Sequence, residues 1–189
     1  MKGITNDCYS CDVPCVPNEP NISTRPLVCW DFYSGFDSYS VFFHMISSFE
    51  GEYNFLSNFW MCSVEYEGII YPSSEHAYVA AKTTDSELRK QIVSLETPAQ
   101  VKRFGRTLVL RDNWELIKLS VMVDIVSTKF EQHPDLMAKL KASAPHELVE
   151  GNTWGDTTWG QCPVGNGKNW LGKILMSIRD NGDKDGEVE

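Results

Sequence analysis

The chain has 189 residues, of which 42% are hydrophobic and 23% are charged, and its formal net charge at pH 7 is -9. The length and composition are those of a globular domain with enough chain to bury one sizeable core. The acidic balance argues against a protein that coats DNA without regard to sequence, because such binding needs a basic face, but it allows one nucleotide to bind in a pocket.

The apolar residues indicate neither a membrane protein nor a secreted one. No apolar run approaches the ~20 residues that are needed to cross a bilayer. The first residues also lack the basic and then apolar pattern of a secretory signal. We therefore expect an intracellular, cytoplasmic protein with no membrane partner. In that compartment its cysteines would be reduced thiols.

Residues 1–26 are rich in Asn, Pro, Ser, Thr and Cys and show no hydrophobic period, which predicts a flexible N-terminal arm. Cys8 and Cys11 within this arm have the spacing of metal ligands, and Cys15 follows them. However, no set of Cys or His partners with the usual spacing completes a zinc site. We predict no metal site and no cofactor, and a metal-dependent interaction module built on these cysteines is the weaker alternative.

Two short β elements are predicted after the arm. Aromatic and β-branched residues favour a strand near residues 41–46, and residues 48–58 have the composition of a loop. Residues 61–71 favour a hairpin, because two short strand-like runs flank a Glu67-Gly68 turn. The hairpin would lead the chain directly into the most informative segment of the sequence.

That segment has the pattern of a helix start, because Pro72 cannot continue an earlier helix and Ser73 or Ser74 can cap a new one. Glu75 then lies in the first turn, and Lys82 projects from the same face about 10 Å further along the axis. On one interpretation the carboxylate and the amine bracket a small substrate. On the other, Glu75 interacts with the helix dipole and Lys82 is a solvated cation.

The remainder of the chain is predicted to be mostly helical, and caps mark the helix ends. The expected helices are 87–95 after Asp85 or Ser86, 98–105 between Thr97 and Gly105, a long helix opened by a capping box of Asp112 and Glu115, 135–143 after Pro134, and a last helix capped by Asn169. An apolar stripe on the long helix comprises Trp114, Ile117, Val121 and Ile125.

The order of these elements predicts the fold class. The sequence contains no repeats and no alternation of helices with parallel strands. We therefore expect an α+β fold, a predominantly helical single domain with a small antiparallel β element. The domain would span residues 27–180, and an acidic tail would follow at 181–189.

Three further segments have the composition of ligand-binding regions. One glycine-rich loop carries Trp154, Asp156 and Trp159, and its indole rings either stack on a base or anchor the loop to the core. The glycine-rich residues 165–169 either hold a phosphate at a helix N-terminus or form a plain turn. The basic residues between 102 and 111 either contact phosphate or form a solvated helix face.

A series of motifs follows in order from about residue 54 to residue 179. They are Phe55-Leu56-Ser57-Asn58-Phe59, Tyr71-Pro72-Ser73-Ser74-Glu75-His76, Ala80-Ala81-Lys82, Thr97-Pro98-Ala99-Gln100, Gly105-Arg106, Arg111-Asp112-Asn113-Trp114, Lys129-Phe130, Leu148-Val149-Glu150, Asp156-Thr157-Thr158-Trp159-Gly160 and Gly167-Lys168-Asn169-Trp170-Leu171-Gly172-Lys173. In this order they resemble the NADAR family, small bacterial, phage and eukaryotic proteins named for their association with NAD and ADP-ribose metabolism.

The resemblance implies hydrolysis of an N-glycosidic bond. One branch of the family removes ADP-ribose from guanine bases in nucleic acid, and another cleaves phosphorylated pyrimidine intermediates of riboflavin synthesis. The resemblance also implies that Glu75, Lys82 and Asp156 are catalytic. The residues expected to bind substrate are Asn58, Phe59, Tyr71, Ser74, His76, Arg106, Trp114, Trp159, Gly160 and Asn169. Val79 stands where the family usually has glutamine, so one polar contact in the pocket is expected to be missing.

Two mechanisms fit these residues. In the first, the Lys82 amine attacks the sugar C1 and holds the opened sugar as a Schiff base, with Glu75 and Asp156 as acid, base or positioning groups. In the second, water attacks directly and Lys82 only holds phosphate. The alternative to an enzyme is a module that binds ADP-ribose or a nucleotide without turnover. The expected partners are ADP-ribosylated guanine or a nucleotide-like small molecule, with ADP-ribosylated DNA or RNA as a further candidate.

Overall fold

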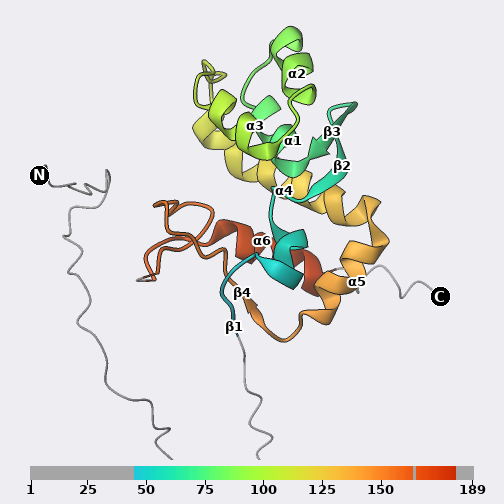
Figure 1. Ribbon diagram of the computed structural model, residues 1–189, viewed down its shortest axis with the longest axis vertical. Coiled ribbons are helices and arrows are strands. Elements are labelled where there is room, and N and C mark those ends of the chain that lie inside the picture. The colour runs from blue at the N-terminus through green and yellow to red at the C-terminus, as the bar shows by residue number, and fades with distance from the viewer. Residues whose placement is uncertain (1–44, 164, 182–189) are drawn as a thin grey trace, which may run out of the picture. The chain divides into compact units, whose positions relative to one another are not determined.

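The structure is a computed structural model that describes residues 45–163 and 165–181. Its elements, in chain order, are β1 (Met45–Ile46), η1 (Gly51–Leu56), β2 (Met61–Tyr66), β3 (Ile69–Ser73), α1 (Ser74–Ala80), α2 (Ser86–Val93), α3 (Pro98–Gly105), α4 (Trp114–Gln132), α5 (Pro134–Ala142), β4 (Glu147–Leu148) and α6 (Trp170–Asn181). Figure 1 shows α2 and α3 at one end of this part of the chain and β1, β4 and α5 toward the other. The predicted N-terminal arm with its cysteines, and the tail from residue 182 onward, lie outside the described residues.

The predicted hairpin is confirmed. β2 and β3 pair antiparallel, and Glu67 and Gly68 form the turn with positive φ angles of 48° and 75°. Val64 and Tyr71 are partners across the hairpin, and both side chains are fully buried. Because β3 continues into α1 without a break, the hairpin fixes where α1 begins.

Hydrogen bonds on two sides hold the start of α1. The Ser73 side chain accepts from the backbone N–H of His76 at 3.4 Å, which makes Ser73 the cap, as expected. The backbone N–H of Glu75 donates to the backbone carbonyl of Asn58 at 3.0 Å. The first turn of α1 is therefore tied to the segment that precedes β2.

The end of α1 differs slightly from the expectation. The helix ends at Ala80, and Lys82 lies in the turn that follows, where its N–H donates to the carbonyl of Val79 at 3.2 Å. Val79 itself is fully buried, and a Cβ added at Gly105 would lie 2.8 Å from it. Val79 therefore fills the contact between α1 and α3.

Two other helices begin where the sequence predicts. The Asp85 carboxylate caps α2 and accepts from the first N–H groups of that helix at 2.8 and 3.2 Å. Thr97 and Gln100 form a capping box at the start of α3, which ends at Gly105. The segment that follows Lys82 therefore carries two short capped helices, α2 and α3.

Three expectations about local structure are wrong. Asp112 and Glu115 form no capping box, because Asn113 is the N-cap of α4, with a left-handed φ of 63° that asparagine tolerates well. The expected loop at 48–58 contains the 3-10 helix η1. The strand expected near residues 41–46 is present as β1, but it pairs in parallel with β4, whereas only an antiparallel β element was expected. Strands of two residues are too short to show an alternating pattern.

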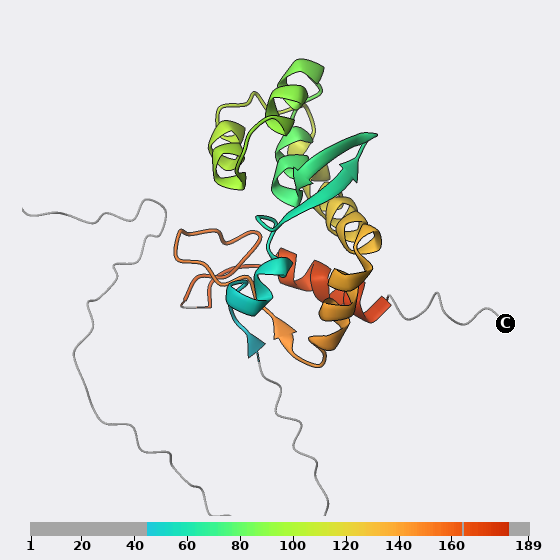
Figure 2. The same cartoon turned by 45° about the vertical axis from the view of Figure 1, so that its right-hand side comes forward.

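The long helix α4 forms the centre of the packing, as the apolar stripe predicts. Trp114, Val121 and Ile125 on this stripe are buried. The helix packs against α1 and β2 on one part of its length and against α5 and α6 on another. Figure 2 shows α4 extending behind α1 and the hairpin toward α5. The predicted α+β class, weighted to helix, is confirmed, and in the described range no helix is long and apolar enough to cross a membrane.

Lys129 on α4 is a buried cation with a structural role. Its Nζ donates to the backbone carbonyls of Phe55 at 2.6 Å and Ser57 at 3.0 Å. Burial lowers the pKa of this amine to about 8. The bonds hold the end of η1 against α4, and this segment carries Asn58 and Phe59 into the neighbourhood of α1.

We expect Lys129→Met to reduce the free energy of unfolding by roughly 2–4 kcal/mol, because two buried carbonyls lose their donor. Urea unfolding of the purified protein measures this change. Lys90→Met is the matched control, since Lys90 and its partner Glu87 are both exposed, and should change stability by less than about 0.5 kcal/mol. Equal losses in the two variants would contradict the structural role of Lys129.

Candidate active site

The side chains of Glu75 and Lys82 are both half-buried and interact electrostatically. Burial raises the pKa of Glu75, and the positive charges of Lys102 and Lys82 oppose this rise. Burial lowers the pKa of Lys82, the Glu75 carboxylate opposes that change, and the charges of Lys102 and Arg106 add to it. A larger fraction of the Lys82 amine is therefore neutral, and the neutral amine is the nucleophilic form.

Lys102 links this pair to two exposed aromatic rings. Its Nζ lies 5.5 Å from the ring centroid of Phe59 and 5.2 Å from that of Trp154. Phe59 is 39% exposed and Trp154 is 62% exposed, so ligand can reach both rings. We call Phe59, Lys102 and Trp154 the Lys102 clamp. It brings a cation and two flat apolar surfaces beside the Glu75–Lys82 pair.

An aromatic cluster contacts the same pair from α1. The ring of Tyr78 lies 5.3 Å from that of Trp114 and 5.4 Å from that of Trp159, in the second case edge to face. The Nζ of Lys82 lies 5.3 Å from the Tyr78 ring centroid. Burial raises the pKa of Tyr78, so its hydroxyl is neutral. Trp159 therefore anchors its loop on α1, whereas Trp154 remains exposed.

Asp156 fixes the loop that carries these tryptophans. One of its carboxylate oxygens, Oδ1, accepts from the backbone N–H groups of Thr158 and Trp159 at 3.0 and 2.9 Å. The Asn152 side chain accepts from the N–H of Asp156 and donates to its carbonyl, at 2.9 and 2.8 Å. The Asp156 charge also raises the pKa of Glu75, which places this carboxylate in the same cluster.

Close backbone contacts hold this loop in place. A Cβ added at Gly160 would lie 2.1 Å from the carbonyl oxygen of Glu150, and one added at Gly167 would lie 2.2 Å from that of Gly160. Any side chain at either position would force these backbones apart. Within residues 165–169, Gly167 therefore packs closely against the backbone of Gly160, whereas Gly165 and Asn166 are exposed.

A further carboxyl group, Glu150, belongs to the cluster and was not predicted as a site residue. Its Oε2 is buried and has no hydrogen-bond partner within residues 45–163 and 165–181. Burial raises the pKa of Glu150 to about 7, Asp156 adds to the rise, and Lys102 opposes it. The sequence signal was an acidic residue that directly follows the apolar Leu148 and Val149, a pattern that does not by itself separate a buried carboxyl from a loop residue.

The NADAR domain family matches residues 42–181 of the chain. The chain belongs to the NADAR family. The predicted resemblance is thereby confirmed, while the catalytic roles that it implies for Glu75, Lys82 and Asp156 stay predictions.

Individual relatives agree with this membership. The chain is 40% identical over 131 residues to the N-glycosidase YbiA of Escherichia coli (strain K12), which covers 68% of this chain and 81% of that protein. It is 36% identical over 155 residues to a riboflavin biosynthesis protein of Vibrio vulnificus, covering 81% of this chain and 41% of that protein. The NMR structure of E. coli YbiA matches with a TM-score of 0.67 and 34% identity, covering 79% of this chain and 94% of that chain.

In this NADAR domain, His76 was expected to bind substrate, but both of its ring nitrogens are engaged. The side chain is fully buried, with Nδ1 2.7 Å from the Ser73 hydroxyl and Nε2 3.1 Å from the carbonyl of Leu95. Because a carbonyl can only accept, Nε2 carries the proton and Nδ1 accepts from Ser73. This arrangement suits a role in holding the start of α1.

Asn169 is likewise engaged in the fold. Its Oδ1 accepts from the N–H of Glu150 at 3.1 Å, and its Nδ2 donates to the carbonyl of Leu148 at 2.8 Å. α6 begins directly after Asn169, as predicted, and the Asn169 carbonyl accepts from the N–H of Lys173 at 3.1 Å, while the side-chain amide joins the start of the helix to the segment after β4. Asn169 acts on the cluster by positioning the backbone of Glu150.

The other predicted binding residues divide into two groups. Ser74 and Asn58 each have a buried side-chain oxygen that lacks a partner among the described residues. Arg106 is exposed at the end of α3, and its positive charge lowers the pKa of Lys82. Tyr71 is fully buried, and the charges that act on it are those of Arg89 and Glu67, so the structure does not bring it to the cluster.

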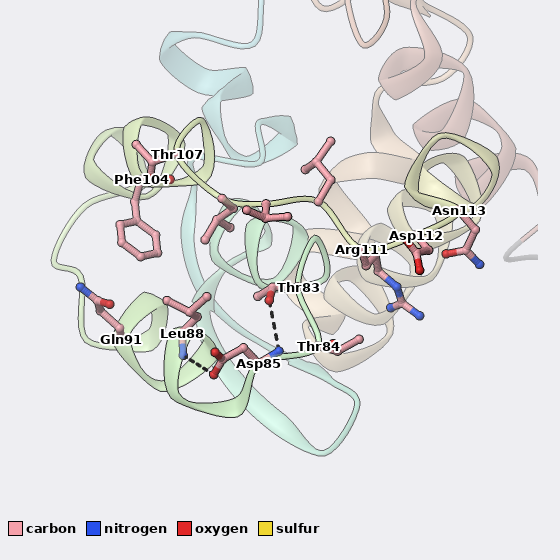
Figure 3. A pocket seen from close by; sticks show the side chains of 13 residues that line it. Thr83, Thr84, Asp85, Leu88, Gln91, Phe104, Thr107, Arg111, Asp112 and Asn113 are labelled. Carbon is pink, nitrogen blue, oxygen red and sulfur yellow. Dashed lines mark hydrogen bonds between the residues drawn. The ribbon is translucent and has the colours of Figure 1, made fainter.

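A cavity of about 1070 Å³ lies beside this cluster, between α2, α3 and residues 107–113 (Figure 3). Neither Glu75 nor Lys82 lines it. The lining of the cavity includes Thr83, the residue that follows Lys82, and Arg111. The N–H of Arg111 donates to the carbonyl of Lys82 at 2.8 Å. Figure 3 shows Asp85 in the cavity wall already bonded to the N-terminus of α2. The cavity is thus a neighbour of the acid–lysine cluster and not its pocket.

Cysteine and metal chemistry have no centre in the described range. Cys62 and Cys162 are free thiols, and both are half-buried. Across residues 45–163 and 165–181, no group of three or more His, Cys, Asp or Glu residues is placed to hold a metal ion. The residues of the alternative metal-dependent module, Cys8, Cys11 and Cys15, lie outside this range.

Proposed function

We propose that this protein is an N-glycosidase that removes ADP-ribose from ADP-ribosylated guanine bases in nucleic acid. The observation that carries the proposal is one electrostatic cluster of Glu75, Lys82 and Asp156 beside the aromatic ring of Tyr78. Membership of the NADAR family, which includes relatives named N-glycosidases, supports the reaction class.

Lys82 is the nucleophile in this proposal. Its neutral amine forms a bond to the sugar C1 while the bond from C1 to the base nitrogen breaks and the base takes up a proton. The sugar ring then opens, and the amine holds C1 as a protonated Schiff base. Water adds to C1, and the sugar leaves as the amine is restored.

Glu75 and Asp156 support this attack from two directions. The Glu75 carboxylate lies next to the amine, where its negative charge stabilises the positive charge that develops on the sugar. Asp156 has one oxygen committed to the loop, and its charge keeps the cluster acidic. The two carboxylates and the amine suit the charge changes that occur at C1 during the reaction. A site that only binds a nucleotide would not need all three groups.

The Lys102 clamp supports a nucleic-acid substrate. Phe59 and Trp154 offer exposed rings on which a base beside the modified guanine can stack, worth roughly 1–3 kcal/mol per base. Lys102 between them, with the exposed Arg106 nearby in the same charge cluster, can contact phosphate. This local basic character exists although the whole chain is acidic.

Phosphorylated pyrimidine intermediates of riboflavin synthesis are the second candidate substrates. Relatives in Vibrio vulnificus and Zea mays that are named for riboflavin biosynthesis favour this class. Lys102 and Arg106 would then hold the single phosphate, and Lys82 would attack the ribose C1 in the same way. A module that binds ADP-ribose without turnover is the third candidate.

Activity on two substrates measured side by side separates these candidates. The first is DNA that carries ADP-ribosyl-guanine, and the second is the ribosylamino-pyrimidine phosphate. Release of ADP-ribose from the first supports the proposal. Cleavage of only the second would replace it with the riboflavin-pathway substrate, and ADP-ribose binding with no turnover of either would replace it with a binding module.

The exposed ring of Trp154 provides a further prediction. We expect Trp154→Ala to raise KM for the modified DNA about 10-fold, with kcat little changed, because stacking of one base is lost. Steady-state kinetics on the DNA and on free ADP-ribosyl-guanosine measures this. Trp154→Phe keeps an aromatic face and should restore most of the affinity. An equal effect on the free nucleoside would contradict a contact with a neighbouring base.

A further inference from the structure

Glu150 is held in position by its backbone on both sides. Its N–H donates to Oδ1 of Asn169 at 3.1 Å, and its carbonyl accepts from the N–H of Gln161 at 2.9 Å. A Cβ added at Gly160 would lie only 2.1 Å from the same carbonyl oxygen, so the segment after β4 and the loop pack backbone to backbone. The fold therefore fixes the backbone from which the Glu150 side chain projects.

The carboxyl group of Glu150 belongs to the cluster, and one of its two oxygens has no partner there. Its Oε2 is buried and lacks a hydrogen-bond partner among the residues that the structure describes. Three charged groups face it from the surrounding elements, namely Asp156 of the loop, Lys102 of α3 and Glu75 of α1. A buried carboxyl between two other carboxylates favours its neutral, protonated form, because a third negative charge there would be poorly solvated.

Glu75 and Glu150 differ in the cations around them. Two lysines, Lys102 and Lys82, favour the carboxylate form of Glu75, whereas Lys102 alone does so for Glu150. Two carboxyl groups in one site whose surroundings separate their protonation states are suited to separate roles in acid–base chemistry. With two lysines beside it, Glu75 is the better suited to act as a carboxylate that stabilises the sugar, and Glu150 is the better suited to donate a proton.

We propose that Glu150 is the acid that protonates the departing base. This inference rests on the proposed N-glycosidase function. As the Lys82 amine forms its bond to C1 and the bond from C1 to the base nitrogen breaks, the Glu150 carboxyl proton moves to the base, which leaves neutral. Glu150 is then a carboxylate and takes a proton from the water that adds to the Schiff base carbon, which returns the site to its starting state.

The reaction then needs Lys82 in its deprotonated form and Glu150 in its protonated form. The rate rises on the acid side as Lys82 becomes neutral, and it falls on the alkaline side as Glu150 loses its proton. We expect Glu150→Gln, which has the same shape but no acidic proton, to lower kcat/KM by about 10²–10⁴-fold. The variant should keep the rise on the acid side and lose the fall on the alkaline side.

The experiment measures kcat/KM against pH for the wild type, Glu150→Gln and Glu147→Gln on whichever of the two substrates the wild type cleaves. Glu147 is exposed on β4, so its variant should match the wild type. Retention of ADP-ribose binding and of the urea midpoint shows that Glu150→Gln is folded. If that variant does not fold, the wild-type profile decides, and the absence of an alkaline fall overturns the inference.

The outcomes separate the two proposals. An active wild type with a Glu150→Gln variant that is within 10-fold of it, or that keeps the alkaline fall, overturns the role of Glu150 and leaves the glycosidase function intact. A wild type that cleaves neither substrate overturns the proposed function and this inference with it. A deep loss of rate together with loss of the alkaline fall supports both.

Discussion

Lys82→Ala is expected to lower kcat by on the order of 10³-fold or more, because the variant has no amine to attack C1. Lys82→Arg should be almost as inactive. Arginine keeps the positive charge at this position but cannot form a Schiff base, since its guanidinium stays protonated. Single-turnover kinetics on the substrate that the wild type cleaves measures both losses.

Chemical trapping tests the same prediction independently of rate. Borohydride added to the wild type with substrate should reduce the Schiff base and leave the sugar joined to Lys82, which mass spectrometry of the digested protein locates. Lys102→Arg is the matched control, since it changes a lysine of the same cluster that does not react, and it should still be trapped. If Lys82→Arg turns over substrate at close to the wild-type rate, and no adduct forms, water attacks directly and Lys82 only holds phosphate.

Glu75→Gln is expected to lower kcat by about 10²–10⁴-fold, since the carboxylate that stabilises charge on the sugar is gone. It should also shift the pH profile in a defined direction. The Glu75 charge raises the pKa of Lys82 against the effect of burial. Without that charge the pKa of Lys82 falls further, so the rise of kcat/KM on the acid side should move to lower pH.

The pH dependence of the residual activity distinguishes this electrostatic role from a loss of structure. A shift of the acid-side rise to higher pH, or no shift at all, would show that Glu75 does not act on Lys82. Glu87→Gln serves as the control, because Glu87 is an exposed residue of α2 whose partner Lys90 is also exposed. Its rate and its pH profile should be those of the wild type.

Local sequence signals predicted much of the fold because they act over a few residues. The serine at position 73, the Asp85 cap and the capping box of Thr97 each satisfy N–H groups of the adjacent helix turn, so their effect does not depend on distant parts of the chain. The Glu67-Gly68 turn is specified in the same way, by residues that accept positive φ.

Expectations failed where a distant contact decides the conformation. The sequence around Asp112 matches a capping box, yet the N-terminus of α4 follows Arg111, whose N–H is bound to the carbonyl of Lys82. Asn169 stands directly before α6, as expected, yet its side-chain amide bonds to Leu148 and Glu150, about twenty residues earlier. Such contacts form only when the segments pack together, and no local pattern records them.

The candidate site was likewise predictable from local sequence only in part. Glu75 and Lys82 could be paired from their spacing alone, because both lie at the two ends of one short helical segment. Lys102 lies 20 residues after Lys82, and Glu150 and Asp156 lie 68 and 74 residues after it, so only the folded chain brings their charges together. The unpaired Oε2 of Glu150 is likewise a property of the packing around it.

The sequence by itself determined the family, the helical character of the domain, the hairpin and the start of α1, because motif order and capping residues are written in neighbouring positions. Tertiary structure alone decided which ionisable groups share a site, which tryptophan is exposed, and which of the predicted residues are committed to hydrogen bonds within the fold. The physical reason is that pKa values and ligand access depend on burial and on charges from remote segments, and both are fixed only when the core around α4 closes.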